Sequence, residues 1–338
     1  MIDFLFISPH LKKIGETYVL PRLCEFSHNK ELNIALFNVA GEWDHLKKSD
    51  KHIVIDNKFR WVVNLAPDLE KMFPWLNYRI WLSFASISIF FGLLHALNKH
   101  SIKACVARMA TSSVGLCSFF STKTKFIASM AGVPLKSAIR SATWPILYKK
   151  LDCIVVPCES MKNNISALTK RNENDILVCP NPVLEEDFIT KNFLPSIEDE
   201  KCDLLFVGRL TNQKGVDTLI KTLALLDNSF FLHIFGDGED ESKLKIYAKK
   251  IGVEHKIKFY GRVNNPWKNI NDYNIYLMPS RWEGPGHTII EALSHGIPSI
   301  VSNCPYGPEE TIDYGKFGEV FEIDDCDDFA DKIQKTWK

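Results

Sequence analysis

Two cations and two carboxylates in the second half of the chain could together hold an anionic sugar derivative. Arg209 and Lys214 follow the apolar run 203–207, and Glu283 and Glu291 lie further along the chain. Guanidinium and ammonium groups bind a pyrophosphate, whereas carboxylates accept hydrogen bonds from sugar hydroxyls. These residue types, in this order, therefore indicate a site for a sugar that is linked to a nucleotide diphosphate.

A glycine-containing helix start supplies a second kind of phosphate ligand. The segment 284–286 reads Gly-Pro-Gly and precedes a predicted helix at 287–294. Glycine lets the backbone approach a ligand closely, and the first N–H groups of a helix have no partner within it. We therefore expect the N–H groups near Gly286, His287 and Thr288 to bind phosphate. His287 is equally compatible with an ordinary residue at a helix cap.

Each of these groups has a simpler explanation when it is taken alone. Arg209 and Lys214 could be surface cations at the start of a helix, and Glu283 and Glu291 could be a capping carboxylate and a solvated one. Cations at a helix N-terminus oppose the positive end of the helix dipole, which favours an anionic partner beside them. The prediction rests on the order and spacing of the set.

The elements that would position these residues are repeated βα units. Short apolar runs alternate with longer amphipathic stretches, which predicts parallel sheets. Ligands of such sheets bind at the loops that follow the strands. The predicted strands are 4–8, 33–37, 103–107, 125–128, 153–156, 176–178, 203–207, 230–235, 257–260, 275–278 and 299–301. The predicted helices are 17–27, 80–97, 112–120, 137–151, 160–169, 216–226, 240–251, 287–294, 309–314 and 328–335.

The length of 338 residues predicts two domains. A Pro- and acid-containing stretch without a clear period marks the seam between them. We expect an N-terminal domain at 1–185, a linker at 186–201 and a C-terminal domain at 202–338. The segment 80–97 has no charge but barely reaches the length of a membrane span, so a helix packed on a sheet is expected there.

Charge is distributed unevenly although the net charge is zero. Residues 1–190 carry 23 Lys and Arg against 17 Asp and Glu, and no acid lies between Glu70 and Asp152. Basic side chains mixed with aromatic ones suit an anionic membrane surface, although a solvated basic surface is the plainer alternative. The basic residues of this stretch are Lys71, Arg79, Lys99, Lys103, Arg108, Lys123, Lys125, Lys136, Arg140, Lys149 and Lys150, and the aromatic ones are Phe73, Trp75, Trp81, Phe119, Phe120 and Trp144.

Other function classes are disfavoured by what the sequence lacks. None of the nine cysteines forms a CxxC pair, and the first residues have no basic region of a signal peptide, so free thiols and a cytoplasmic protein are expected. Asp325 and Asp327 precede a predicted helix and suit a helix cap better than a metal site. The turn at 236–238 lacks the third glycine of a dinucleotide fingerprint, which leaves hydride transfer a distant alternative. No nucleic-acid-binding pattern is visible.

The same residues resemble glycosyltransferase family 4, a retaining family with the GT-B fold. Its Gly-Arg-Leu…Lys-Gly element corresponds to 208–215, and its E-x7-E element corresponds to Glu283…Glu291. Asn181-Pro182-Val183 resembles the interdomain segment of the family, and 303–310 resembles a segment of transferases that build bacterial surface polysaccharides. The resemblance implies two Rossmann-like domains that face each other across a cleft. It also implies Arg209 and Lys214 on the diphosphate, Glu283 at the sugar and Glu291 at the ribose.

The expected protein is a hexosyltransferase that uses a nucleotide-sugar, with UDP as the nucleotide, and needs no metal or other cofactor. Its expected acceptor is a lipid-linked sugar or polysaccharide at the inner face of the cell membrane. In the first loop only Gly15 remains of the usual glycine pair, and it would admit the donor phosphate or the acceptor. Ser129-Met130-Ala131-Gly132 stands where a family His is often found. Because of these departures, an alternative function is retained: a non-catalytic subunit that binds a nucleotide-sugar or supports a partner transferase.

Overall fold

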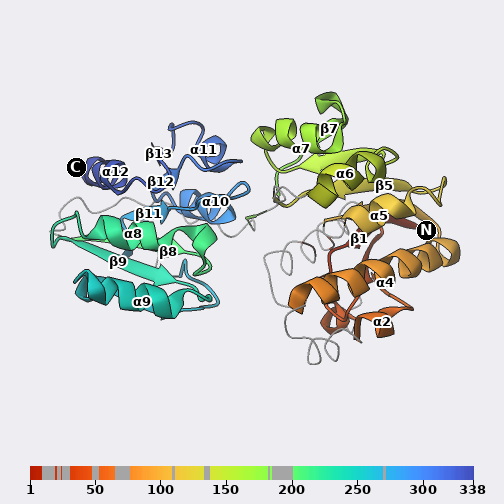
Figure 1. Ribbon diagram of the computed structural model, residues 1–338, viewed down its shortest axis with the longest axis horizontal. Helices are drawn as coiled ribbons and strands as arrows, with labels where there is room; N and C mark the ends of the chain where they lie inside the picture. Colours follow the sequence, from red (N-terminus) through yellow and green to blue (C-terminus); the bar gives the residue numbers. More distant parts are fainter. Residues whose placement is uncertain are drawn as a thin grey trace. The chain divides into compact units, whose positions relative to one another are not determined.

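The chain folds into two compact units, each built on a parallel sheet (Figure 1). The first comprises Met1–Pro157 with Met161–Pro182, and the second comprises Cys158–Ser160 with Val183–Lys338. The predicted linker lies outside the described residues except for Lys201, so the predicted domain bounds stay a prediction. The computed structural model describes residues 1–9, 20, 24, 31–47, 53–64, 77–108, 111–132, 138–181, 183–184, 201–268 and 272–338.

Unit 1 contains a sheet of seven parallel strands in the order β3-β2-β1-β4-β5-β6-β7. Phe4 of β1 lies beside Ile34 on one side and Ala104 on the other, so β1 and β4 form the point where the strand order reverses. The strands are β1 (Ile2–Ile7), β2 (Ile34–Asn38), β3 (Ile53–Asp56), β4 (Ile102–Ala107), β5 (Lys125–Ser129), β6 (Cys153–Val156) and β7 (Ile176–Val178).

The helices of unit 1 include a long one, α4, that packs beside two others. Ile89 and Leu93 of α4 are fully buried. A Cβ at Gly92 would lie 1.9 Å from Asn57 Oδ1, so this position needs glycine for the close contact. No helix in the described part of the chain has both the length and the apolar character of a membrane span. The helices are α2 (Arg60–Asn64), α4 (Asn77–Lys99), α5 (Thr111–Cys117), α6 (Ala138–Leu147) and α7 (Lys162–Thr169).

Unit 2 contains a sheet of six parallel strands in the order β10-β9-β8-β11-β12-β13. Its strands are β8 (Cys202–Val207), β9 (Phe230–Phe235), β10 (Ile257–Gly261), β11 (Ile275–Met278), β12 (Ser299–Ser302) and β13 (Gly318–Phe321). Its helices are α8 (Val216–Leu223), α9 (Glu241–Lys250), α10 (His287–Ser294), α11 (Pro308–Thr311) and α12 (Cys326–Trp337).

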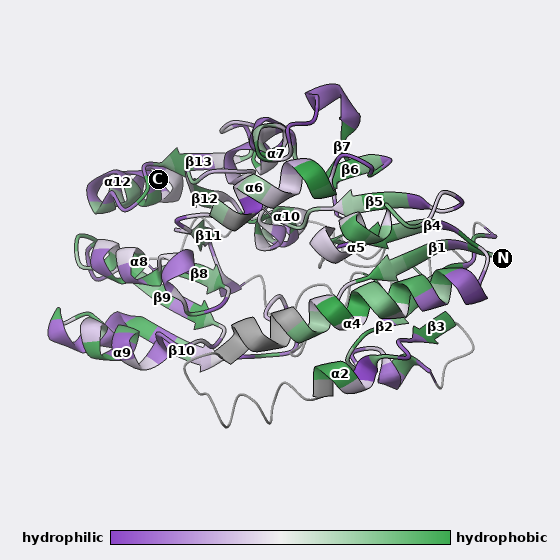
Figure 2. Ribbon diagram, turned by 45° about the vertical axis from the view of Figure 1, so that its right-hand side comes forward, coloured by the Kyte–Doolittle hydropathy of each residue, from purple (hydrophilic) through white to green (hydrophobic). Residues whose placement is uncertain are grey.

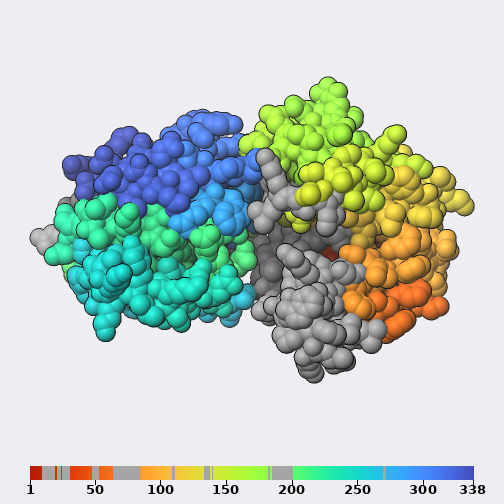
Figure 3. Space-filling model, viewed as in Figure 1, coloured from red at the N-terminus to blue at the C-terminus, as the bar shows by residue number. Residues whose placement is uncertain are grey.

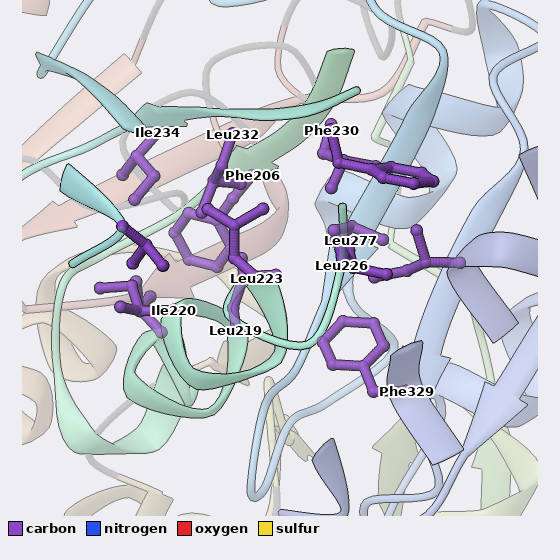
Figure 4. Close-up of a cluster of buried hydrophobic side chains, with 14 of the residues drawn as sticks. Phe206, Leu219, Ile220, Leu223, Leu226, Phe230, Leu232, Ile234, Leu277 and Phe329 are labelled. Carbon is purple, nitrogen blue, oxygen red and sulfur yellow. The ribbon is translucent and has the colours of Figure 1, made fainter. Parts of the chain in front are cut away.

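Alternate strand residues of unit 2 feed two separate hydrophobic layers, as the period of two requires. Leu204 and Phe206 of β8 join a cluster with α8, α9 and α12, whereas Leu205 joins a cluster with α10 and with Ile312, the residue after α11. In the first cluster Phe206, Leu232 and Ile234 face side chains of α8, and Phe329 comes from α12 (Figure 4). Side chains of α8, α9 and α12 cover much of the face of unit 2 seen in Figure 3, in green to dark blue. Both faces of the sheet are therefore covered.

The predicted α/β class is confirmed, and most predicted elements lie within a few residues of the observed ones. Two four-residue strands, β3 and β13, were not among the predicted ranges. Asp325 caps α12 by accepting from the N–H groups of Asp327 and Asp328, both at 3.0 Å, which confirms the capping interpretation. All nine cysteines are free thiols. Of the predicted helix 17–27, only Leu20 and Cys24 are described, and both are helical.

Candidate functional site

The predicted donor-site residues of unit 2 follow β8 and β11, the two strands between which the strand order reverses. β8 and β11 pair directly, with Ile275 beside Leu204, while β9 flanks β8 and β12 flanks β11. Loops leave two such strands in opposite directions, which makes their carboxyl ends the usual ligand site of an open α/β sheet. The loops that contain Arg209 and Glu283 therefore share one edge of the sheet.

The structure brings Lys214 and Glu283 into direct contact, although 69 residues separate them. Lys214 Nζ donates to Glu283 Oε2, and the two side chains are only 14% and 16% exposed. Ser280 Oγ donates to the same carboxylate oxygen at 3.3 Å. Because an ammonium group has three donors, Lys214 can hold Glu283 and still donate to a phosphate. The pair therefore fixes a cation and a carboxylate next to each other.

Arg209 lies in the same loop and is exposed. Its Nη2 donates to Gln213 Oε1 at 3.3 Å, and Gln213 Nε2 donates to the backbone oxygen of Trp282 at 2.9 Å. In the described part of the chain, this neutral contact with Gln213 holds the exposed guanidinium near the 280–286 loop. This arrangement leaves Arg209 able to bind an anion.

Glycines allow the two loops and the helix start to come together. Gly215 has φ +63°, and a Cβ there would lie 1.9 Å from the backbone oxygen of Pro279, so α8 begins against the end of β11 only with glycine. Gly286 has φ +71° and is the N-cap of α10. Thr288, in the first turn of α10, accepts a hydrogen bond from Tyr276 OH at 2.5 Å, which leaves its own hydroxyl proton for a ligand.

Glu291 is positioned by a tryptophan that the sequence analysis did not single out. Trp267 Nε1 donates to Glu291 Oε2 at 3.0 Å, and the Trp267 side chain is only 5% exposed. The indole ring stacks on the ring of His295, with centroids 5.9 Å apart. The carboxylate is thereby oriented through the loop after β10. In the sequence, Trp267 stands out only as a single Trp after Asn-Pro, and this pattern does not indicate that its partner is Glu291.

Arg281 was also missed, and it ties the two loops together. Its guanidinium makes ion pairs with Asp217 and Asp324, each at 2.8 Å, and Nη1 donates to the backbone oxygen of Asn212 at 2.8 Å. The backbone N–H of Arg281 donates to Gln213 O, also at 2.8 Å. The hydrogen bond to Arg281 holds the pKa of the Asp324 carboxyl below its usual value.

The consequence of these contacts is that one arginine fixes the distance between the two loops. The Arg281 N–H to Gln213 O bond of 2.8 Å and the bond from Gln213 to Trp282 join the turn Asn212–Lys214 to the residues next to Glu283. All the donors of the guanidinium are engaged within unit 2, so Arg281 acts as a support for the site.

The segment 303–310 packs against the Gly-Pro-Gly turn. A Cβ at Gly307, which has φ +117°, would lie 2.7 Å from the backbone oxygen of Gly284, and Thr311 Oγ1 donates to Pro285 O at 2.6 Å. Burial raises the pKa of the nearby Cys304 thiol to about 11. This thiol is therefore protonated at neutral pH, and the segment supports the shape of the turn.

The glycine turn at 236–238 serves close packing beside the same loop. A Cβ at Gly236 would lie 1.8 Å from Gly208 O, and one at Gly238 would lie 2.2 Å from Leu210 O. Leu210 N donates to Asp237 O at 2.9 Å. The turn lies at residues 239 and 240, directly after these glycines, and the neighbouring backbone requires glycine at both 236 and 238.

The remaining predicted residues either lie outside the described part of the chain or belong to unit 1. Gly15 lies outside the described residues. Ser129 accepts a 3.4 Å hydrogen bond from Arg108, whose Nη2 also donates to Asn181 Oδ1 at 2.8 Å. In the described part of the chain, no three His, Cys, Asp or Glu side chains gather closely enough to hold a metal ion.

Comparison with known proteins finds matches among glycosyltransferases. Residues 188–338 match the family model described as glycosyl transferases group 1. Over 168 residues the chain is 35% identical to the lipopolysaccharide 1,6-galactosyltransferase of Salmonella typhimurium strain LT2, which covers 48% of this chain and 46% of that protein. The chain spans about half the length of the curated relatives it matches.

Solved structures match over nearly the whole chain. The lipopolysaccharide outer core galactosyltransferase WaaB, in its apo form, superposes with a TM-score of 0.78 over 99% of this chain and 90% of that one, at 23% identity. Anabaena HepE in complex with UDP-glucose gives a TM-score of 0.71 at 15% identity, over 99% of this chain and 89% of that one. These likenesses show the fold. The chain is an α/β protein of two Rossmann-like domains, an architecture shared with solved glycosyltransferases.

Proposed function

We propose that the chain is a retaining, metal-independent glycosyltransferase of family 4 that uses a nucleotide-sugar as donor. The observation that carries the proposal is the contact of Lys214 with Glu283 beside Arg209, at the point of unit 2 where the strand order reverses. The match of residues 188–338 to glycosyl transferases group 1 supports it from the sequence side.

In the proposed reaction the negative charge that develops on the leaving diphosphate is stabilised by fixed donors. Arg209, Lys214 and the backbone N–H groups at the start of α10 would supply these donors, with Thr288 adding its hydroxyl. Glu283 would orient the transferred sugar. The acceptor hydroxyl would attack the face from which the leaving group departs, which gives retention of configuration.

The donor is proposed to be a UDP-sugar that carries a hexose or an N-acetylhexosamine. Glu291, oriented by Trp267, would accept hydrogen bonds from the ribose hydroxyls. The similar proteins include a galactosyltransferase and a transferase solved with UDP-glucose, which supports this choice of donor class. Arg209 and Lys214 take the part that a divalent cation has in other transferases, so no metal is included in the proposal.

The acceptor is proposed to be a lipid-linked sugar or a polysaccharide of the bacterial cell surface. Relatives described as acting on lipopolysaccharide and on poly(ribitol-phosphate) support this acceptor class. We propose that the protein works in the cytoplasm at the inner face of the membrane, where an acceptor of this kind is presented.

Labelled donor turnover tests the proposal. The full chain is incubated with a panel of labelled UDP-sugars and a membrane extract, and the label in the lipid or polysaccharide fraction is measured. Transfer that Lys214→Ala removes, and that the exposed control Lys221→Ala retains, supports the proposal. Tight UDP-sugar binding without transfer to any acceptor would favour the non-catalytic subunit instead.

A further inference from the structure

We infer that the side of unit 1 formed by α4 and the end of α5 docks on an anionic lipid surface. This deepens the proposed location at the membrane, but it rests on a different part of the molecule from the donor site. The residues of this aromatic–basic surface are Ile87, Phe91, Phe119, Phe120, Lys123, Lys149 and Lys150.

The apolar part of the aromatic–basic surface is large and continuous. Ile87, Phe91 and Phe120 are 50%, 51% and 64% exposed. Phe90 bridges the last two, with ring centroids 5.1 Å from Phe91 and 5.6 Å from Phe120. Contiguous exposed apolar groups of this kind mark interaction sites, whereas single ones do not.

The fold of unit 1 does not use these side chains for its core. Helix α4 already buries Ile89, Leu93 and Ala96 on its inner side. Ile87 and Phe91 are one turn apart on the opposite side, so an apolar stripe remains outside. Figure 2 shows the middle of α4 as largely green, and Figure 3 shows orange side chains of α4 at the surface of unit 1. The outward stripe therefore remains available for a partner.

Basic groups border this apolar stripe. Lys150 Nζ lies 4.9 Å from the centroid of the Phe119 ring. Lys149 is the exposed neighbour of Lys150 in the sequence, and the exposed Lys123 follows Phe120 by three residues. Aromatic rings with neighbouring lysines are typical of membrane interfaces, because the rings enter the headgroup region while the ammonium groups remain at the charged surface. Lysines alone at helix ends would be explained by the helix dipole.

The structure also reduces the set of basic and aromatic side chains, among those predicted from the sequence, that could contact a membrane. Arg108 is only 8% exposed, Lys103 pairs with Asp3 at 2.6 Å, and Lys125 pairs with Asp152 at 2.7 Å. Trp144 is only 5% exposed and stacks on Tyr148, so the expectation that it contacts a membrane is wrong. In the described part of this stretch, Lys123, Lys149 and Lys150 are exposed, whereas Lys71 and Lys136 lie outside the described residues.

Charge decides which partner the aromatic–basic surface fits. A symmetric dimer would bring the lysines of two copies into one interface, because such an interface pairs the same surface with itself, and it would add no acidic groups to neutralise them. An anionic lipid surface complements the lysines and accepts the rings. An anionic lipid surface is therefore the partner that matches both the apolar side chains and the lysines of this surface.

Co-sedimentation with vesicles tests the inference with the full chain. Vesicles of phosphatidylcholine alone are compared with vesicles that also contain phosphatidylglycerol. We expect binding to the second kind, weakened by added salt. Replacing Lys123, Lys149 and Lys150 together with Gln should weaken it roughly a hundredfold, since each lysine near an anionic surface contributes about fivefold. Phe91→Ser with Phe120→Ser should weaken it at least about tenfold.

A matched control lies on α9 of unit 2, where Ile246 is 70% exposed and Lys249 and Lys250 end the helix. Ile246→Ser with Lys249→Gln and Lys250→Gln should leave vesicle binding unchanged. Equal binding to both kinds of vesicle, or equal losses from control and test variants, would overturn the inference. A dimer that only the test variants abolish would show that a second copy is the partner. UDP affinity, measured on the same variants, separates this result from the proposed donor site.

Discussion

The two units present their charged and aromatic side chains in opposite ways. At the strand ends of unit 2, Lys214, Glu283 and Arg281 are bonded to groups from neighbouring loops. On the α4 side of unit 1, Phe91 and Phe120 are exposed, and the ammonium group of Lys150 lies over the ring of Phe119. A converging, cross-linked set suits a small charged ligand whose atoms must be held at fixed positions. A broad exposed set suits an extended partner.

This difference also separates the measurements that each region should affect. Changes at the strand ends of unit 2 should alter donor binding and turnover, and changes on the α4 side of unit 1 should alter association with membranes.

Loss of either diphosphate cation should reduce turnover by about 10²–10³-fold, because each donates to charge that grows in the transition state. Lys214→Ala and Arg209→Ala are compared with the exposed control Arg262→Ala in a labelled-donor assay. Thermal melting checks that the variants remain folded. Near-normal turnover in both variants would remove the diphosphate assignment.

Substitution of the two carboxylates should affect different measurements, UDP affinity for Glu291 and turnover for Glu283. Glu291→Gln should weaken UDP itself, whereas Glu283→Gln should lower turnover and leave UDP affinity nearly unchanged, because UDP lacks the sugar that Glu283 is proposed to contact. A lost hydrogen bond to a charged group costs about 1.5–3 kcal/mol, or roughly 10–100-fold in affinity. Calorimetric titration with UDP measures both variants. The reverse ranking would exchange the two roles.

Trp267→Phe should lower the affinity for UDP, as Glu291→Gln does, but by a smaller factor. The substitution retains an aromatic ring and removes the indole donor, which lies 3.0 Å from Glu291 Oε2. Trp267 acts on UDP only through the orientation of Glu291, so we expect a smaller loss of UDP affinity, roughly fivefold, or about 1 kcal/mol. An unchanged affinity in the same titration would show that Glu291 does not need this support.

Arg281→Ala should destabilise unit 2 by about 2 kcal/mol, because Asp217 and Asp324 would lose their shared cation. The cost stays moderate because both carboxylates are 48% exposed and water can solvate them. The pKa of Asp324 is lowered in the folded state, so its stabilising contribution is present above its ordinary value of 3.8 and is lost as the pH falls through the folded value. Urea unfolding at pH 7 and pH 3 should therefore show a smaller difference between wild type and variant at the lower pH.

Chelation should have the smallest effect. EDTA is expected to leave turnover unchanged, since the proposed charge stabilisation comes from Arg209 and Lys214. Full loss of activity with EDTA and recovery with Mn²⁺ would contradict a metal-independent reaction.

Much of the fold could be predicted because its signals are local. The strands of unit 2 are short apolar runs, and the Gly-Pro-Gly turn at 284–286 predicts the start of α10. The strand β13 has only four residues and includes Gly318 and Glu319, which weaken a strand pattern. The strand β3 is equally short, although Ile53-Val54-Ile55 is a β-branched run that could have been recognised.

The supports of the site could not be predicted because their partners are distant in the sequence. Arg281 contacts residues 43 to 69 positions away, and Trp267 contacts Glu291 across 24 positions. Only the order of strands in the sheet brings these groups together. The aromatic–basic surface was predicted in part, since sequence alone does not distinguish the exposed Phe120 from the buried Trp144.

The most direct test of the central claim is calorimetric titration of the full chain with UDP and with uridine, in the wild type and in the Arg209→Ala/Lys214→Ala double variant. If these cations hold the diphosphate, the wild type should bind UDP much more tightly than uridine, and the double variant should lose most of that difference while keeping its affinity for uridine. A wild type that binds both alike, or a double variant that retains the full preference for UDP, would contradict the claim.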